Sequence, residues 1–515
     1  MSTESPENVL FVVMDTVRKD RLTPYGYDRP TTPNLDAFAD EATVFEHAVA
    51  PAPWTLPVHA SLFTGMYPSQ HGADQENPYL EGATTLAQTL SNAGYDTACY
   101  SSNAWITPYT HLTDGFDEQD NFFEVMPGDF LSGPLARAWK TMNDNEALRA
   151  IADKLVSLGN TAHEYFAGGE GADSKTPAVI DRTQAFIADS DRSFAFINLM
   201  DAHLPYHPPE EFAAEFAPGV DSTTVCQNSK EYNAGARDID ESEWADIRNL
   251  YDAEIAHIDA QLGRLFDWLK AEGQWDDTMV VVCADHGEPP GEHDLYGHEF
   301  CLYDPLVNVP LLVKHPALDA DRRDDQVELV DLYHTVLDAL NVDGGTPAAG
   351  GDAAVALDRT RSLLSDAYRE FEGVPDADRD PGQRGDGAYA FVEYSRPVVE
   401  LKQLEEKAAS AGISIPEESR FYSRMRAARR TDAKYVRIDR IDDEAYRLDA
   451  DPDETDNVAG AGDPEIEAVS ETLGDFESAV GGAWTDALDD DVSDDAVDEM
   501  DDEAQERLRD PGDLE

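Results

Sequence analysis

Short runs of consecutive apolar residues recur through the first two thirds of the chain, and most of them end in a charged or polar group. Such runs are typical of parallel strands that are buried on both faces of a sheet. We therefore predict strands over 9–14, 97–100, 194–200, 279–284 and 309–313. Apolar residues at helical spacing between them predict helices over 34–41, 86–93, 244–269 and 327–340. This alternation predicts an α/β domain with a mostly parallel central sheet.

The pattern changes beyond about residue 345, where Gly- and Asp-rich linkers flank short alternating runs. Runs of this kind at 389–394 and 435–438 predict a small antiparallel sheet within a C-terminal α+β subdomain. Helical spacing interrupts the earlier alternation and predicts an inserted helical subdomain over 125–178. The predicted organisation is therefore an α/β domain over 1–345, a smaller subdomain over 346–485, and an acidic, largely disordered tail over 486–515.

Charge narrows the range of partners, because 106 acidic residues against 38 basic ones give a net charge of −68. Such a surface repels nucleic-acid phosphates and anionic membranes, so neither is an expected partner. Dense carboxylate also keeps proteins soluble in high salt, which suggests a halophilic source; folding and activity without added salt would contradict this. The N-terminal apolar run is short and lacks a basic lead, and no run approaches a membrane span. We therefore expect a cytoplasmic protein.

One short stretch combines a helix start with a reactive group. Thr55 lies just ahead of an apolar-periodic run, with Pro57 early in it and Gly65 at its end. Thr is a good helix N-cap, Pro suits the first turn, and Gly ends helices. A hydroxyl in this position meets the unpaired N–H groups and the positive end of the helix dipole, which favour an anion. Thr55 is therefore either a helix cap or a nucleophile.

Acid and histidine side chains follow three of the predicted strands, and more occur in the loop after the last of these. They are Asp15, then Asp201 and His203, then Asp285 and His286, and finally Glu292, His293 and His298. Ligands in open α/β sheets bind beyond the carboxyl ends of the strands. Carboxylate and imidazole together suit a divalent ion such as Zn²⁺, Mn²⁺ or Mg²⁺. The sequence therefore predicts a metal site close to Thr55.

Several segments, in this order, resemble the sulfatase branch of the alkaline phosphatase-like hydrolases. They are 15–18, 32–36, 57–65 with 71–72, 285–288, and 446–449 with 451–454. The resemblance implies a large three-layer α/β domain with a smaller C-terminal subdomain. It also implies that Asp15, Asp285 and His286 hold a divalent metal ion together with Thr55, and that Thr55 is the nucleophile. The ion would be Zn²⁺, Mn²⁺, Ca²⁺ or Mg²⁺.

The sequence also departs from the typical sulfatase pattern. Typical members carry a Cys or Ser that is converted to formylglycine, and an Arg follows the motif Pro by two residues; here Thr55 and His59 stand in these positions. Thr is not a substrate for that conversion because its β-carbon bears a methyl group, so no formylglycine is expected. Asn103 and Trp105 stand where sulfatases often have Lys and His, and His298 stands where they often have Lys. A Thr used directly is similar to relatives that act on phosphoryl groups.

The predicted function is metal-dependent hydrolysis of a sulfate or phosphate ester of a small molecule or glycan. A divalent ion would stabilise the alkoxide of Thr55 for in-line attack, which gives a covalent intermediate that water clears. His203 or His298 would protonate the leaving alcohol, and His59 would brace the anion or the metal ligands. The predicted substrate-binding residues are Arg18, Asn103, Trp105, Asp201, His203 and His298.

Several alternatives stay open from the sequence. Arg18 is equally suited to a structural ion pair. His207 and His293 fit loop packing or a second metal site with Asp201. A basic cluster suits either the steering of an anion or pairing with carboxylates across the small sheet; it consists of Arg424, Arg426, Arg429 and Arg430. Two rival functions are transfer of a phospho-headgroup through Thr55 and non-catalytic binding on the same fold.

Overall fold

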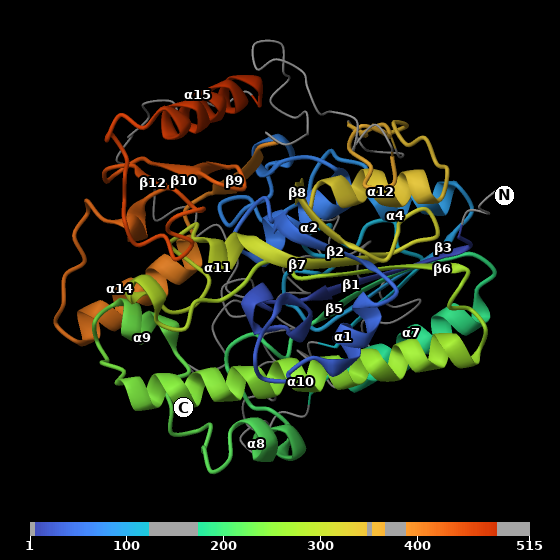
Figure 1. Ribbon diagram of the computed structural model, residues 1–515, viewed down its shortest axis with the longest axis horizontal. Helices are drawn as coiled ribbons and strands as arrows, with labels where there is room; N and C mark the ends of the chain where they lie inside the picture. Colours follow the sequence, from blue (N-terminus) through green and yellow to red (C-terminus); the bar gives the residue numbers. More distant parts are fainter. Residues whose placement is uncertain (1–5, 123–173, 348–352, 366–387, 481–515) are drawn as a thin grey trace, which may run out of the picture.

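The computed structural model describes residues 6–122, 174–347, 353–365 and 388–480. Eight strands form its central sheet, in the order β4-β3-β5-β1-β6-β7-β2-β8 (Figure 1). All of them run parallel except β7, which is antiparallel to both of its neighbours. The strands are β1 Asn8–Met14, β2 Thr43–Val49, β3 Asp96–Ser101, β4 Glu118–Asn121, β5 Ser193–Leu199, β6 Thr278–Cys283, β7 Asn308–Lys314 and β8 Arg322–Glu328.

Helices cover both faces of this sheet and complete a three-layer domain (Figure 1). On one face lie α1 Pro33–Ala39, α7 Thr176–Asp189 and α10 Glu241–Ala271; on the other lie α2 Thr55–Thr64, α4 Leu86–Asn92 and α12 Asp331–Ala339. The central strand β1 is buried along its whole length, as its unbroken apolar sequence predicts. The mostly parallel three-layer architecture is therefore confirmed.

Shorter elements connect these layers. They are the helices α3 Pro68–His71, α8 Glu210–Phe216, α9 Ser229–Asn233 and α11 Asp304–Val307, and the 3₁₀ turns η1 Lys19–Arg21, η2 Thr23–Tyr25, η3 Glu292–Asp294 and η5 Arg420–Tyr422. The turn η1 follows β1 directly, and η3 and α11 lie between β6 and β7. The long loop after β6 is therefore interrupted by two small helical elements.

The C-terminal region forms the predicted antiparallel sheet, in the order β12-β11-β10-β9. Its strands are β9 Ala390–Tyr394, β10 Met425–Arg429, β11 Lys434–Ile438 and β12 Glu444–Tyr446, and its helices are α14 Val398–Ser410 and α15 Pro464–Ala479. Helix α15 covers one face, where Phe476 stacks on Phe391 with ring centroids 4.1 Å apart. Val392 and Ala427 lie on the opposite face of the small sheet and pack into the core of the large domain.

Two differences from the sequence prediction have a common cause. The predicted helix over 327–340 is only α12, because residues 327 and 328 end strand β8. Strands β4 and β8 were not predicted, and both are sheet edges rich in charged or polar residues. Charged side chains are common on edge strands, where they discourage pairing with another chain. The apolar-run criterion therefore finds five inner strands, but it misses both edges and also the inner strand β2, whose apolar run is interrupted by Glu46 and His47.

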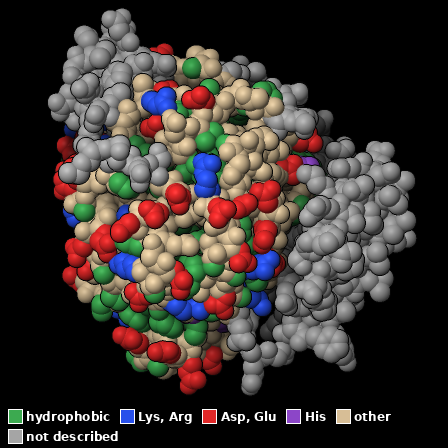
Figure 2. Space-filling model, turned by 90° about the vertical axis from the view of Figure 1, so that its right-hand side faces the viewer, with side chains coloured by type: hydrophobic (Ala, Val, Ile, Leu, Met, Phe, Trp, Pro, Cys, Tyr) green, Lys and Arg blue, Asp and Glu red, His purple; other side chains and the backbone are tan. Residues whose placement is uncertain are grey.

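Parts of the prediction concern residues that lie outside this description. The predicted insert over 125–178 falls mainly there, although α7 begins within it, and the predicted tail over 486–515 falls there entirely. Across the described ranges, no helix has both the length and the apolar character to cross a membrane. Figure 2 shows one face of the molecule, on which acidic side chains are spread widely among Lys and Arg.

Candidate active site

The hydroxyl of Thr55, at the start of helix α2, contacts polar side chains and makes no capping hydrogen bond to the helix backbone. The residue before the first turn is Trp54, so Thr55 begins the helix and its side chain does not cap it. The Thr55 Oγ1 lies 3.4 Å from His286 Nε2 and accepts a hydrogen bond from Asn103 Nδ2 at 3.3 Å. Gly65 ends the helix with φ 70°. The predicted helix is therefore present, and of the two alternatives for Thr55 the structure does not support the helix cap.

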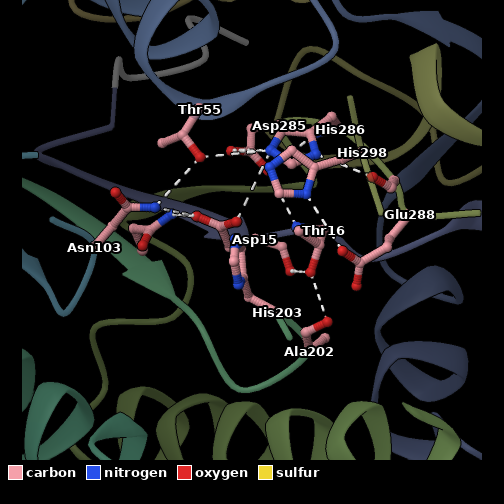
Figure 3. A network of polar contacts seen from close by, with 12 residues as sticks. Asp15, Thr16, Thr55, Asn103, Ala202, His203, Asp285, His286, Glu288 and His298 are labelled. Carbon is pink, nitrogen blue, oxygen red and sulfur yellow. Dashed lines mark hydrogen bonds and ion pairs between the residues drawn. The ribbon is translucent and has the colours of Figure 1, made fainter. Parts of the chain in front are cut away.

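Two neighbouring parallel strands deliver the predicted ligand set to one place. Asp15 follows β1, and Asp285 and His286 follow β6. One ligand atom from each of these residues lies within 4.8 Å of the others. His286 Nε2 is 3.4 Å from Asp285 Oδ2 and 3.9 Å from Asp15 Oδ1. Figure 3 shows the three side chains converging beside Thr55.

Hydrogen bonds fix one oxygen of each carboxylate and leave the other without a partner. Asp15 Oδ2 accepts from Asn103 at 2.8 Å and from Asn198 at 3.0 Å, whereas Asp15 Oδ1 is buried with no hydrogen-bond partner among the described residues. Asp285 Oδ1 accepts the backbone N–H of His286 at 2.9 Å, and Asp285 Oδ2 is likewise buried and unpaired within the described chain. Buried anionic oxygens without donors are costly, and oxygen ligands of this kind suit a divalent cation.

The electrostatics of the cluster also fit a cation. Burial and the neighbouring charge of Asp15 raise the pKa of Asp285 well above its ordinary value. Burial lowers the pKa of His286 to about 3, so its imidazole is neutral, as metal ligation requires. Its Nδ1–H donates to the Gly287 carbonyl at 3.0 Å, which leaves Nε2 as the electron-pair donor facing Asp15 and Asp285.

Thr16, which has an unusual backbone conformation, connects the strand ends that carry Asp15 and Asp285. Thr16 has φ 58°, which is unusual for a β-branched residue. Its hydroxyl donates to the Ala202 carbonyl at 2.6 Å, and its backbone N–H donates to Asp285 Oδ1 at 3.3 Å. Thr16 therefore locks the strand end that carries Asp15 to those that carry Asp285 and Ala202. No sequence pattern distinguishes Thr16 or Asn198, because each is only a polar residue beside or within a buried strand.

The side chain of His59 supports the start of helix α2. Its Nδ1–H donates to the Thr55 carbonyl at 2.8 Å, one helical turn back, and lies 3.8 Å from Asp285 Oδ2. The ring is fully buried and meets Phe196 edge-on, with centroids 5.6 Å apart. Burial lowers the pKa of His59 to about 4, so the ring is neutral near pH 7.

His298 lies beside His286, as Figure 3 shows. Its ring centroid is 4.7 Å from that of His286 and 5.1 Å from that of His203. Burial by itself lowers the pKa of His298, but the carboxylates of Glu299 and Glu288 outweigh burial and raise the pKa to about 9. His298 Nδ1 donates to Glu288 Oε1 at 3.3 Å. The site therefore holds an imidazolium at neutral pH.

The carboxylates of Glu299 and Glu288 are themselves held by an ion pair and a hydrogen bond. Lys230 Nζ contacts Glu299 Oε1 at 2.8 Å, and the hydroxyl of Tyr206 donates to Glu288. Both carboxylates are almost completely buried. Sequence alone does not reveal the roles of Glu288 and Glu299, because one more Glu carries little information in a chain with 106 acidic residues.

The other predicted substrate-binding residues fall into different surroundings. Trp105 is half-buried and packs edge-on against Trp54, with centroids 5.4 Å apart. The guanidinium of Arg18 is buried and pairs with Asp20 at 2.7 Å and Glu292 at 2.8 Å, which favours the structural ion pair.

Asp201, His203 and the C-terminal basic cluster each contact neighbouring protein groups. Asp201 accepts a hydrogen bond from Thr176 and lies 3.6 Å from His257. His203 Nδ1 donates to the Leu204 carbonyl at 2.6 Å. Each Arg of the C-terminal basic cluster contacts a carboxylate: Arg424 with Asp439, Arg426 with Glu393, Arg429 with Asp304, and Arg430 with Asp432 and Glu465. The pairing alternative is therefore the one that the structure supports for this cluster.

Known proteins resemble this chain in both sequence and fold. A family model described as Sulfatase matches residues 7–342. The uncharacterized sulfatase YidJ of Escherichia coli is 27% identical over 64% of this chain and 67% of YidJ. The multifunctional alkaline phosphatase superfamily protein PehA of Trinickia caryophylli is 26% identical over 90% of this chain and 93% of PehA.

Two solved structures share the fold. The phosphonate monoester hydrolase of Agrobacterium radiobacter has a TM-score of 0.59 at 22% identity, and the match covers 92% of this chain and 95% of that one. A protein solved in complex with its substrate D-glucosamine-2-N,6-O-disulfate has a TM-score of 0.63 at 17% identity, with coverage of 93% and 98%. The Sulfatase match spans well over half of the sequence, and the chain therefore belongs to the sulfatase family of ester hydrolases.

Proposed function

We propose that this protein hydrolyses a phosphate or sulfate ester through direct attack by Thr55. The observation that carries the proposal is the place of the Thr55 hydroxyl, which lies 3.4 Å from His286 Nε2 beside two carboxylate oxygens without hydrogen-bond partners among the described residues. The sulfatase family is metal-dependent, and the Asp15, Asp285 and His286 side chains fit a divalent ion. Bound there, such an ion would stabilise the ionised hydroxyl of Thr55 and offset negative charge on the ester.

The remaining steps belong to the side chains of the chain itself. Asn103 Nδ2 donates to Thr55 Oγ1 and to Asp15, so it orients the nucleophile relative to the carboxylate. After its proton is released to solvent, Thr55 Oγ1 attacks the phosphorus or sulfur in line with the leaving oxygen, so that the Thr55 ester bond forms as the bond to the leaving oxygen breaks. His298, as an imidazolium, binds the anionic ester and gives its proton to the leaving alcohol. Water then hydrolyses the Thr55 ester.

The hydroxyl nucleophile favours phosphoryl over sulfuryl transfer within this proposal. A Thr cannot become formylglycine, which is the group that typical sulfatases use. PehA, described as a multifunctional alkaline phosphatase superfamily protein, matches nine tenths of this chain, and a phosphonate monoester hydrolase shares its fold. These likenesses support a phosphate or phosphonate ester as the preferred substrate, and leave the alcohol to be identified by assay.

A panel with one shared leaving group tests the choice of substrate. We expect p-nitrophenyl esters of phosphate or phosphonate to be hydrolysed about tenfold or more faster than p-nitrophenyl sulfate, which corresponds to about 1.4 kcal/mol in activation free energy. The assay is run in high salt with Zn²⁺ or Mn²⁺, and with a chelator as control. If the sulfate is the best substrate, the phosphoryl preference is wrong. If the chelated protein is as active as the metal-supplied one, the proposed metal dependence is wrong.

His298 gives a separate prediction about pH. Because its pKa is about 9, the imidazolium is present below that pH and is lost above it, so kcat/KM is expected to fall as pH rises through about 9. His298→Ala is expected to lower kcat/KM about 100-fold or more. His298→Lys keeps the positive charge on a group whose ordinary pKa is about 10.4, so its alkaline limb should move upward. An unchanged alkaline limb in His298→Lys would show that another group controls it.

A further inference from the structure

A buried ion network joins the C-terminal sheet to the loop that carries His286. The carboxylate of Asp304 contacts Arg429 Nη2 at 2.7 Å and Lys434 Nζ at 3.1 Å. Lys434 Nζ also lies 2.7 Å from Glu454 Oε1, and the other oxygen of Glu454 accepts the backbone N–H of Asp304. Arg429, Lys434 and Glu454 are almost completely buried. Three charged groups of the C-terminal subdomain thus converge on one residue of the large domain.

Asp304 begins helix α11, and α11 lies directly against the segment beside His286. The backbone N–H of Gly287 donates to the Leu306 carbonyl at 2.8 Å. A Cβ atom at Gly287 would lie 2.0 Å from the Pro305 carbonyl oxygen, so only glycine permits this approach. Because His286 donates its Nδ1–H to the Gly287 carbonyl, the place of Gly287 also sets the orientation of the imidazole.

Removing the charge of Asp304 from this network is expected to displace the backbone around it. Although burial favours the neutral acid, Arg429 and Lys434 hold the pKa of Asp304 well below its usual range, so the carboxylate is ionised. Loss of that carboxylate leaves two buried cations short of a partner, and such unpaired charges force the surrounding backbone to move or to admit water. Asp304 is the first residue of the four-residue helix α11, which leads directly into strand β7, so a displacement of Asp304 acts first on α11.

We propose that Asp304 is a positioning residue for the active site, through which Arg429 and Lys434 of the C-terminal sheet hold helix α11 and thereby the place of His286. This assigns the C-terminal sheet a part in assembling the site rather than a purely separate structural role. The catalytic consequence rests on the function proposed above, whereas the structural link from Asp304 to Gly287 does not.

The test compares Asp304→Asn with a matched variant on the other face of the same sheet. Arg426 also makes a buried ion pair, 3.0 Å from Glu393, but it lies on the face toward α15, where it is 3.8 Å from Glu477. Arg426→Gln therefore destabilises the same sheet without touching Asp304. Hydrogen exchange is measured over residues 283–306 in both full-length variants, and kcat and KM are measured with the best ester of the substrate panel.

In Asp304→Asn, we expect exchange at Gly287 to speed up by about tenfold or more, which is a change that does not depend on activity. We expect kcat to fall about 100-fold, because a small misplacement at a catalytic site has effects of this order, while KM changes little. Arg426→Gln should leave both readouts near wild type at a temperature well below its unfolding midpoint. If Asp304→Asn matches Arg426→Gln on both readouts, the positioning role is overturned.

A second variant covers the case in which Asp304→Asn does not fold. Lys434→Met keeps the Arg429 pair of Asp304 but leaves the buried Glu454 without its cation, so a change in the same direction is expected on both readouts; wild-type behaviour would overturn the proposal. Thr55→Ala, measured alongside, separates this inference from the proposed function. If Thr55→Ala keeps full turnover while Asp304→Asn speeds exchange at Gly287, the nucleophile assignment fails and the structural link stands. The reverse result leaves the nucleophile and removes the link.

Discussion

Replacing Thr55 with alanine is expected to lower kcat by about three orders of magnitude or more, which is the scale seen when a nucleophile is removed. The methyl group of alanine cannot form the covalent ester, and the remaining residues would have to act on water without the positioned hydroxyl. The variant should still bind the metal, because Asp15, Asp285 and His286 are unchanged, although more weakly than wild type, because the Thr55 oxygen is lost. Steady-state kinetics and a metal titration on the same preparation measure both quantities.

Two variants on the same helix control this result. Thr55→Ser keeps the hydroxyl and should retain a substantial part of the turnover. Thr64→Ala removes a second buried threonine, whose hydroxyl donates to the Ala60 carbonyl at 2.7 Å, and should affect stability by about 1 kcal/mol without affecting the chemistry. A non-catalytic binding protein would show no turnover to lose in any of these variants. Full activity in Thr55→Ala would refute direct attack by this residue.

Most of the inner sheet follows from local sequence, because five of its six inner strands are largely apolar runs buried between the helical layers; the sixth, β2, carries Glu46 and His47 in its middle and was missed. The run at 9–14 has no polar position and could be placed in the sheet without knowing its neighbours. The edge strands were missed for the opposite reason: Arg322–Glu328 is charged in its first half, and Val327 is the only apolar residue in its buried second half. Strand order and the reversed direction of β7 depend on contacts far apart in sequence, which no local pattern encodes.

The residues of the candidate site also divide into those that the sequence predicts and those that it does not. The convergence of Asp15, Asp285 and His286 was predictable because they lie just beyond the carboxyl ends of two buried strands, and those strands are neighbours. Asn198 donates to Asp15 from inside β5, where its position in an apolar strand carried no separate signal. The pairing of Arg18 with Glu292 joins segments 274 residues apart, so sequence alone left its role open between substrate and structure.

Asp285→Asn is expected to weaken divalent metal binding by at least about 100-fold and to remove most of the turnover. Substitutions of groups that only support metal ligands already reduce affinity by about 10- to 100-fold, and Asp285 is itself one of the three proposed ligands. An amide oxygen also carries no charge to balance the cation. Titration of the variant with Zn²⁺ and Mn²⁺, followed by calorimetry, measures the change in affinity. Wild-type affinity would remove Asp285 from the ligand set.

In the absence of metal, Asp285→Asn is expected to stabilise the folded protein relative to wild type. The folded-state pKa of Asp285 is raised by burial and by Asp15, above an unfolded value of about 3.9. The folded protein therefore binds more protons than the unfolded chain across the window that begins near pH 4, and its stability falls as pH rises through that window. In the presence of a chelator, Asp285→Asn should therefore unfold at a higher temperature than wild type near pH 7, and its unfolding should depend less on pH.

Metal reverses this order, because an ion that binds only the folded state stabilises it by about 2.7 kcal/mol at a free concentration 100 times its Kd. Wild type should gain this stabilisation, and Asp285→Asn should not. Asp259 is a matched control: its buried carboxyl has a pKa raised by burial to about 6, and it accepts the backbone N–H groups of Asn34 and Leu35. Asp259→Asn should also reduce the pH dependence but should keep the full response to metal. A metal response lost equally in both variants would mean that the carboxyl group of Asp285 acts through general stability rather than as a ligand.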